Sequence, residues 1–208
     1  MATTGETPPG FVEDNNYDNF NNIKVDDSSY ARTNPEIGPT SKKSIYISQF
    51  GFAIPAGATI NGIIHRVDHR GESTNICRET LQLTKTAGVG QGTDKWNRQN
   101  LTTSFVSQYD GTGTDLWGSS WTVSEINASG FGSFMEHYNS HASGTRYCDI
   151  EFASIDVYYT PAAATMIAKL VDSLRLNSLV HGRLTSIMRW LGLYPKQQVQ
   201  RRTGKCFI

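Results

Sequence analysis

The chain has 208 residues and a formal net charge of zero, with 38% hydrophobic and 18% charged residues. A domain of this length buries enough apolar surface to fold without disulfides or structural metals. No apolar run reaches the roughly 18 residues of a membrane span, and the first residues have neither the basic nor the apolar region of a signal peptide, so we expect neither a membrane protein nor an exported one.

The charge is unevenly distributed along the chain. Residues 162–208 carry eight basic side chains and one acidic side chain, a net charge of +7, which leaves −7 for the rest. An acidic body joined to a basic segment indicates a partner or a contact within the chain.

The body has the pattern of an all-β domain. Residues 1–19 are polar and contain Pro8, Pro9 and Gly10, which predicts an extended arm. From residue 20 to 161, short apolar or alternating runs are separated by Gly, Asn, Asp and Ser clusters, which predicts strands and turns. The expected strands are 22–25, 44–52, 59–68, 77–85, 102–108, 131–138 and 147–160.

The last expected strand changes phase along its length. Its alternation slips near Ala153 and Ser154, which predicts a bulge there. The pattern assigns one face to Cys148, Ile150 and Phe152, and the other face to Ile155, Val157 and Tyr159.

Four separated segments resemble a known domain. They are DDSSYA (26–31), FGFAIPAGATINGI (50–63), TDLWGSSWTVSEINASGFGS (114–133) and IDVYYTP (155–161). In order and spacing they resemble a widespread domain of phage and prophage proteins, over roughly residues 19 to 161. The resemblance implies a jelly-roll or Greek-key sandwich in virion-associated proteins, with no catalytic residues in its pattern. The polar start, Cys148 and the basic C-terminal segment depart from that pattern.

Two tryptophans stand four residues apart in the third segment. Trp117 and Trp121 are followed by Ile126 and Phe131, which predicts a short irregular or helical segment that lays aromatic rings over one open end of the sandwich. The alternative is that the two indoles stack on a sugar.

Candidate catalytic and metal sites receive little support. The pairs His65/His69 and His137/His141 have H-x-x-x-H spacing, but the first pair lies in an expected strand, where the two residues stand about 13 Å apart. We expect surface histidines.

The Gly-rich segment 87–95 lacks the G-K-[ST] ending of a phosphate loop, so we expect a flexible strand connection. Cys77, Cys148 and Cys206 lack C-x-x-C spacing and are expected as reduced thiols. We expect no enzyme, catalytic residue, cofactor or metal.

The C-terminal segment 162–208 changes to helical spacing. Apolar residues form two stripes rotated by about a third of a turn, which predicts two amphipathic helices that break near Asn177 and Ser178. They could pack on their own sandwich or on another chain, and basic helices also bind membranes. We favour contact with a protein partner through Ile167, Leu170, Leu174, Arg175, Leu179, Arg183, Leu184, Ile187, Arg189, Trp190 and Leu191.

The sequence as a whole predicts a structural subunit of a bacteriophage particle, which could be a capsid decoration, head fibre, collar or tail/baseplate accessory protein. It would be an all-β sandwich (20–161) with an extended N-terminal arm (1–19) and a helical basic tail (162–208) that holds it among other virion proteins, as a homo-oligomer. We expect location in the virion, no membrane partner and no nucleic-acid partner. The alternative is a carbohydrate-binding module that recognises the host surface through Trp117, Trp121 or exposed tyrosines.

Overall fold

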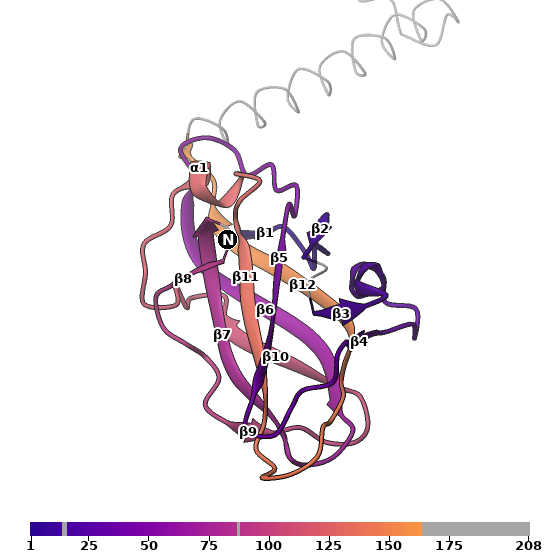
Figure 1. The fold of residues 1–208 in the computed structure, drawn as a ribbon. Helices are drawn as coiled ribbons and strands as arrows, with labels where there is room; N and C mark the ends of the chain where they lie inside the picture. The colour runs from indigo at the N-terminus through magenta and orange to yellow at the C-terminus, as the bar shows by residue number, and fades with distance from the viewer. Residues whose placement is uncertain (14–15, 87, 164–208) are drawn as a thin grey trace, which may run out of the picture. The chain divides into compact units, whose positions relative to one another are not determined.

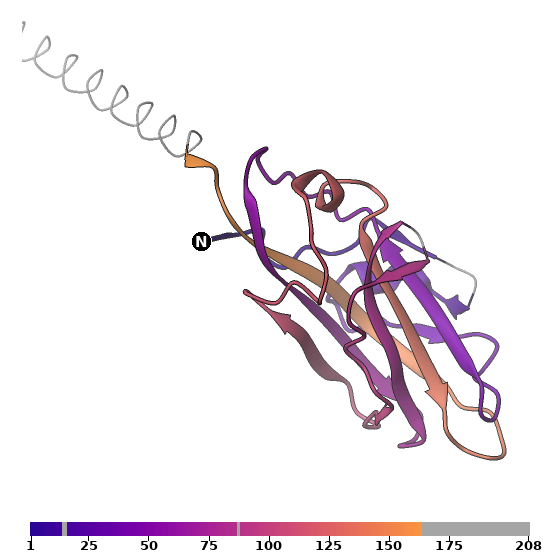
Figure 2. The ribbon, with the colours of Figure 1, turned by 90° about the vertical axis from the view of Figure 1, so that its left-hand side faces the viewer.

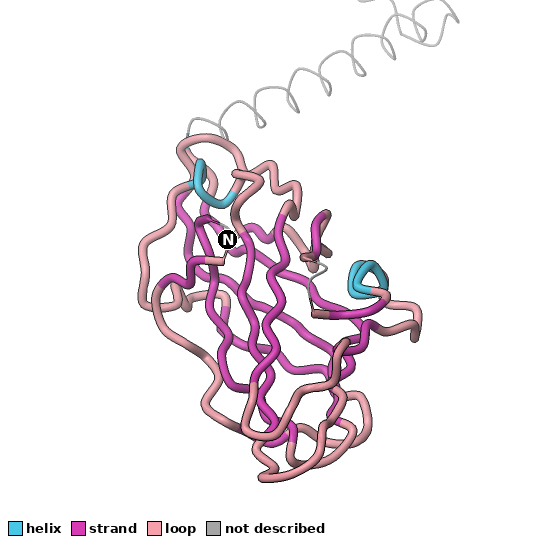
Figure 3. Tube along the Cα trace, viewed as in Figure 1, coloured by secondary structure: helices cyan, strands magenta, loops and turns pink. Residues whose placement is uncertain are grey.

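Two antiparallel sheets form the part of the chain that the structure describes. The structure is a computed structural model, and it describes residues 1–13, 16–86 and 88–163. The boundary between the two units of the chain falls after Ala162. Strands dominate the first unit, with two short helical turns (Figure 3). Its elements are β1 (Ala2–Thr3), β2 (Phe11–Val12), β3 (Tyr17–Asp18), η1 (Phe20–Lys24), β4 (Ala31–Thr33), β5 (Lys42–Ser48), β6 (Thr59–Gly71), β7 (Ile76–Thr86), β8 (Val89–Gln91), β9 (Gln99–Asn100), β10 (Val106–Thr112), α1 (Val123–Ile126), β11 (Gly132–Asn139) and β12 (Cys148–Thr160).

The strands are divided between sheets A and B. Sheet A has the order β10-β6-β12-β4-β3, with β1 also paired to β12. Sheet B has the order β2-β5-β11-β7-β8, with β9 also paired to β7. Successive members of the series β5, β6, β7, β10, β11 and β12 lie in alternate sheets, so the two sheets form layers that face each other (Figures 1 and 2).

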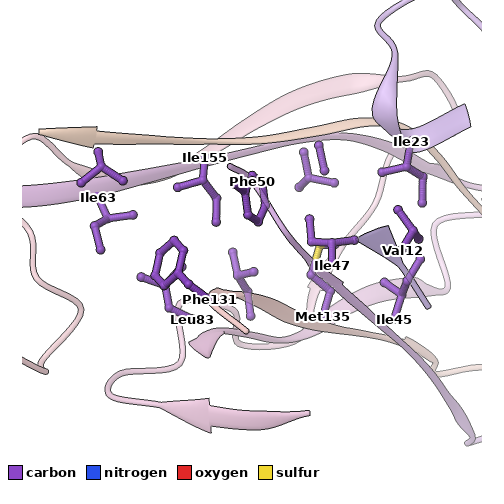
Figure 4. Close-up of a cluster of buried hydrophobic side chains, with 14 of the residues drawn as sticks. Val12, Ile23, Ile45, Ile47, Phe50, Ile63, Leu83, Phe131, Met135 and Ile155 are labelled. Carbon is purple, nitrogen blue, oxygen red and sulfur yellow. The ribbon is translucent and has the colours of Figure 1, made fainter. Parts of the chain in front are cut away.

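The core fills the space between the two sheets. Ile63 and Ile155 of sheet A face Leu83, Phe131 and Met135 on the side of sheet B (Figure 4). These residues are at most 1% exposed, because alternation along each strand turns every second side chain inward. Burial of each such side chain stabilises the fold by about 1.5–3 kcal/mol.

The bulge expected in the last strand is present but lies earlier. The pairing of β12 with β6 shifts register between Ile150 and Phe152. Ile150 and Ile155 therefore both belong to the core, while Phe152 lies under the Arg66 guanidinium, whose carbon is 4.9 Å from the ring centroid. The prediction that Ile150 and Phe152 share a face is wrong, because the extra residue, Glu151, separates them.

The N-terminal segment is extended and takes part in both sheets. Strand β1 pairs with β12, β2 with β5 and β3 with β4. Val12 and Tyr17 are buried, with 2% and 3% of their surface exposed. Residues 1–13 and 16–19, the described part of the expected arm, therefore contribute to the sandwich itself.

Three local expectations differ from the structure. Residues 22–25, expected as a strand, lie largely in the 3-10 helix η1, which follows Asn19 in the left-handed conformation that asparagine tolerates. The strand expected at 102–108 is β10, Val106–Thr112. The Gly-rich segment expected as a flexible connection contains β8, since Gly88 and Gly92 have positive φ and allow the turns at its two ends.

The aromatic end of the sandwich is a packed lid. Trp117 is fully buried, and its Nε1 donates to the Ile63 carbonyl at 2.9 Å. Trp121 is 7% exposed, and its Nε1 donates to the Leu116 carbonyl at 2.9 Å. Helix α1 is short, and a capping box closes its N-terminus. The Thr122 hydroxyl accepts from the Glu125 backbone N–H, and the Glu125 carboxylate accepts from the Thr122 backbone N–H. The prediction that the two indoles cover one end of the core is confirmed.

We expect Trp117→Ala to lower the free energy of unfolding by about 3–5 kcal/mol, because the change empties a fully buried site and leaves the Ile63 carbonyl without its donor. Urea unfolding followed by circular dichroism measures the loss. Tyr109→Ala is the control, since Tyr109 is 52% exposed. Equal stabilities for the two variants would contradict the assignment.

Candidate functional site

The residues singled out by sequence fall in two places. The tail residues from Ile167 to Leu191 lie outside the described residues. Trp117 has no exposed face, and Trp121 borders an open groove of about 1030 Å³ together with Ile54 and Val123. The structure therefore leaves Trp117 no ring surface with which to stack on a sugar.

The outer face of sheet A carries a cluster of arginines and aromatic rings. Alternation along β6 turns Val67 and His69 inward, and Arg66, Asp68 and Arg70 to the other face. We call this surface the arginine–aromatic face; it consists of Tyr30, Arg32, Arg66, Arg70, Phe105, Tyr109, Tyr147 and Phe152.

Rings and guanidinium groups alternate across part of this face. The Arg32 guanidinium carbon lies 4.5 Å from the centroid of Tyr147 and 5.3 Å from that of Tyr30. The Arg70 guanidinium carbon lies 5.1 Å from the centroid of Tyr30 and 4.5 Å from that of Phe105. Each cation lies within cation–π distance of two rings, a contact that contributes about 0.5–1 kcal/mol at an exposed site.

A single carboxylate orders the two arginines. Arg32 donates to both oxygens of Asp149, with Nε to Oδ1 at 2.7 Å and Nη2 to Oδ2 at 2.8 Å. Arg70 Nε donates to Asp149 Oδ2 at 2.9 Å. The hydrogen bonds from Arg32 to Asp149 raise the pKa of Arg32 well above its usual value, although partial burial opposes the shift. The side chain of Asp149 is 4% exposed, so the carboxylate is a fixed anchor beneath the face.

Two open hollows lie beside Arg32. The first, of about 420 Å³, is lined by Tyr147, Asn34 and Glu36 among others. The second, of about 400 Å³, is lined by Tyr30, Asn22 and Ser29 among others. Arg32 and Asp18 line both hollows. Each hollow thus combines an aromatic ring with amide, carboxylate and guanidinium groups, a set that can stack on a ring and form hydrogen bonds around it.

The histidines correct an expectation from the sequence. His65, His69 and His137 are at most 3% exposed, so the prediction of surface histidines is wrong for these three. They lie on the inward faces of β6 and β11. The structure joins one member of each H-x-x-x-H pair, with His69 Nδ1 3.1 Å from His137 Nε2, because the two sheets pack face to face.

A polar network surrounds these rings. His137 Nδ1 is 3.1 Å from the Tyr17 hydroxyl, and the Trp96 ring centroid lies 5.5 Å from that of His69 and 5.3 Å from that of His137. His65 Nε2 is 2.9 Å from Ser133 Oγ.

The buried imidazoles are neutral in the fold. Burial lowers the pKa of His65 and of His137 to about 3, and the positive charge of Arg78 adds to the effect at His137. Burial and the neighbouring His137 and Arg78 hold the pKa of His69 well below its usual range. In the part of the chain that the structure describes, no three His, Cys, Asp or Glu residues are grouped to hold a metal ion.

Sequence reasoning missed most of the arginine–aromatic face. The run from Arg66 to Arg70 did carry a signal, since basic and acidic residues at every second position predict a charged strand face. The meeting of Arg32 with Tyr147 carried none, because it depends on the pairing of β4 with β12 across more than a hundred residues.

Comparisons with known proteins add one structural similarity. No family model and no curated protein sequence matches the chain. The chain aligns with the N-terminal cellulose-binding domain of β-1,4-glucanase C from Cellulomonas fimi at 11% identity and a TM-score of 0.35, over 78% of this chain and 96% of that one. At this identity and TM-score the alignment says nothing of what this chain binds. No helix among residues 1–13, 16–86 and 88–163 has the length and apolar character needed to cross a membrane.

We expect the buried histidines to make the fold sensitive to acid. A folded pKa near 3 lies below the unfolded value near 6.5, so the contribution of His65 is complete above pH 6.5 and is lost as the pH falls toward 3. His65→Asn should reduce the loss of stability between pH 7 and pH 4.5 by roughly 1 kcal/mol or more for each pH unit. Urea unfolding at several pH values measures the slope.

The control for this prediction is His141→Asn, because His141 lies in the loop after β11 and is only partly buried. It should retain the wild-type slope. Titrating carboxylates are common to all three proteins, so their contribution cancels in the comparison. A wild-type slope in His65→Asn would show that His65 is not the acid-sensitive group.

Proposed function

We propose that this chain is a structural subunit of a bacteriophage particle. In this proposal the sandwich is a rigid interaction module, and the segment 162–208 attaches it to other virion proteins and to further copies of the chain. The virion is then its location, and chemistry on a substrate forms no part of its role.

The observation that carries the proposal is the place of the phage-like motifs in the fold. The segment 50–63 forms the corner between β5 and β6, and 114–133 supplies the lid and α1. The segment 155–161 includes the C-terminal part of β12, whose Ile155 and Val157 belong to the core. Most of the apolar motif residues are buried, including Phe50, Phe52, Ile54, Trp117, Trp121, Ile126 and Phe131. The shared pattern therefore describes residues that specify a fold, as expected when a family shares a scaffold.

We further infer that the sandwich is a jelly roll. The supporting observation is that β10-β6-β12-β4 faces β5-β11-β7-β8, with the longer strands alternating between the sheets along the chain. Jelly rolls occur in viral capsid proteins and in lectins. Since a fold alone does not decide function, the choice between these two classes depends on experiment.

Attachment by residues 162–208 has an electrostatic and an apolar basis. The segment carries +7 and the rest of the chain −7, and its apolar stripes include Leu170, Leu179 and Leu184. Exposed ion pairs contribute only about 0–1 kcal/mol each, so we assign most of the binding energy to the apolar residues.

We expect a chain ending at Ala162 to fold but to be absent from particles. The sandwich forms a unit that ends at Ala162, so circular dichroism of the shortened chain should retain its β signal and a cooperative melt. Particles assembled in the presence of tagged full-length or shortened chain are purified and probed for the tag. Normal incorporation of the shortened chain would contradict attachment through the tail, and absence of the full-length chain from particles would contradict the subunit role.

A second candidate function is binding of a host-surface glycan. The arginine–aromatic face favours it, because Tyr30 and Tyr147 are half-buried rings that line hollows together with amide and carboxylate groups. Trp117 is fully buried and Trp121 is only 7% exposed, so we place the site of this candidate on the outer face of sheet A.

For this candidate we expect Tyr30→Ala and Tyr147→Ala each to weaken glycan binding by roughly twofold to tenfold in affinity electrophoresis, since a stacked ring contributes roughly 0.5–1.5 kcal/mol beyond the area that it buries. Tyr138→Ala is the matched control. Its ring also covers an arginine, with the Arg98 guanidinium carbon 4.7 Å from the ring centroid, but it belongs to sheet B. Equal losses in all three variants, or no glycan bound by the wild type, would rule out the face as a glycan site.

A further inference from the structure

A small hollow opens between β10 of sheet A and the strands β7 and β9 of sheet B. Its volume is about 120 Å³, and it is lined by His69, Arg78, Asn100, Leu101, Thr102, Val106 and Gln108. A water molecule occupies about 30 Å³ of liquid, so the hollow has room for a group of a few heavy atoms. None of its lining residues belongs to the lid or to the arginine–aromatic face.

Arg78 lies on the core side of its strand because of a bulge. The pairing of β7 with β11 shifts register after Glu136, so that Glu79 is passed over and Arg78 stands opposite His137. Side chains opposite each other in a sheet share a face, and His137 is fully buried on the inner face. The guanidinium is consequently drawn into the side opening of the sandwich.

Arg78 differs from four other arginines of the sandwich. Arg32, Arg66, Arg70 and Arg98 each form an ion pair with a carboxylate. In the described part of the chain no carboxylate lies within ion-pair distance of Arg78, whose side-chain hydrogen bond goes to the Gln99 amide oxygen. Burial lowers the pKa of Arg78, so its charge is only partly solvated.

The acid that acts on Arg78 from a distance is already engaged. Asp110 partly offsets the lowered pKa of Arg78, but its carboxylate accepts from Trp96 Nε1 at 2.9 Å and from Gln108 Nε2 at 3.2 Å. A partly desolvated guanidinium with no close anion favours the entry of one.

A second donor can come from His69. Its Nδ1 is bound to His137 Nε2, whose ring in turn meets the Tyr17 hydroxyl through Nδ1. When Tyr17 donates to His137 and His137 donates to His69, the hydrogen of neutral His69 lies on Nε2, the remaining ring nitrogen of a residue that lines the hollow. If both hydrogen bonds run the other way, from His69 to His137 to Tyr17, then His69 Nε2 carries a lone pair. An anion in the hollow therefore favours the arrangement in which Tyr17 donates to His137 and His137 donates to His69.

Asn100 completes the set of donors. Its side-chain oxygen accepts from the Cys77 thiol at 3.1 Å, which orients the amide so that its NH2 group is the end left for other contacts. Arg78, His69 and Asn100 thus line one small hollow with N–H groups, while Leu101 and Val106 supply apolar walls.

We propose that this hollow binds a small oxyanion, a carboxylate or phosphate group, with Arg78 as its charge partner and His69 Nε2–H and the Asn100 amide as further donors. The site goes beyond the subunit role and does not depend on it.

Titration of the full-length chain at pH 7.5 with inorganic phosphate, and separately with acetate, tests the proposal. Sodium chloride keeps the ionic strength constant, so that general screening is the same throughout. Nitrogen chemical shifts of the histidine rings report which nitrogen of His69 carries the hydrogen. We expect a saturable change in the tens of millimolar or below, with the hydrogen on Nε2 in the bound form, for at least one of the two anions. The anion that binds more tightly defines the ligand class.

Variants separate a built site from general attraction. Arg78→Gln should weaken binding about tenfold or more, since a hydrogen-bonded charge is lost. Arg146→Gln should bind as the wild type does, because Arg146 also has no carboxylate within ion-pair distance among the described residues but does not line the hollow. If Arg78→Gln fails to fold, Asn100→Ala replaces it, because Asn100 is exposed, and it should also weaken binding. Absence of a saturable change for both anions, or equal binding by the hollow variants and the wild type, would overturn the proposal.

Discussion

The antiparallel pairing of β6 with β12 is the constraint on which the other features depend. The two strands are each 13 residues long and pair from Thr59 with Thr160 to Gly71 with Cys148. Their inner face supplies much of the core, and their outer face holds Asp149 beneath Arg32 and Arg70. The bulge at Glu151 lets one strand serve both purposes, because it keeps Ile150 and Ile155 inward while it turns Phe152 outward.

The interior of the sandwich buries imidazoles as well as large apolar side chains. The lid end is closed by Trp117, Trp121 and Phe131, which bury large apolar surfaces. The interior also contains His69 and His137, whose burial is tolerated because each imidazole is neutral and hydrogen-bonded. A core divided in this way combines a rigid apolar part with a part whose hydrogen bonds can reverse direction.

The sequence predicted what depends on local pattern. The long strands, the lid and the existence of a bulge follow from alternation, turn residues and aromatic spacing, all of which are visible over a few neighbouring positions. The burial of His65, His69 and His137 was not visible, since a histidine in a strand has no local mark of the face it occupies. The arginine–aromatic face and the hollow at Arg78 depend on which strands pair and on a register shift in β7, and neither is encoded over a short window. The site expected in 162–208 lies outside the described residues.

The short N-terminal strands have a consequence for how copies of this protein can meet. Strand β2 covers the edge of sheet B at β5, and β3 covers the edge of sheet A at β4. An uncovered edge strand invites pairing with a strand of another molecule, which leads to aggregation when it is unregulated. The two-residue strands β2 and β3 thus form the sheet edges on one side of the sandwich, and edge strands this short offer little backbone for pairing. Short edges of this kind favour contacts between neighbouring copies through side chains and loops, which can be specific and reversible in a way that continuous backbone pairing is not.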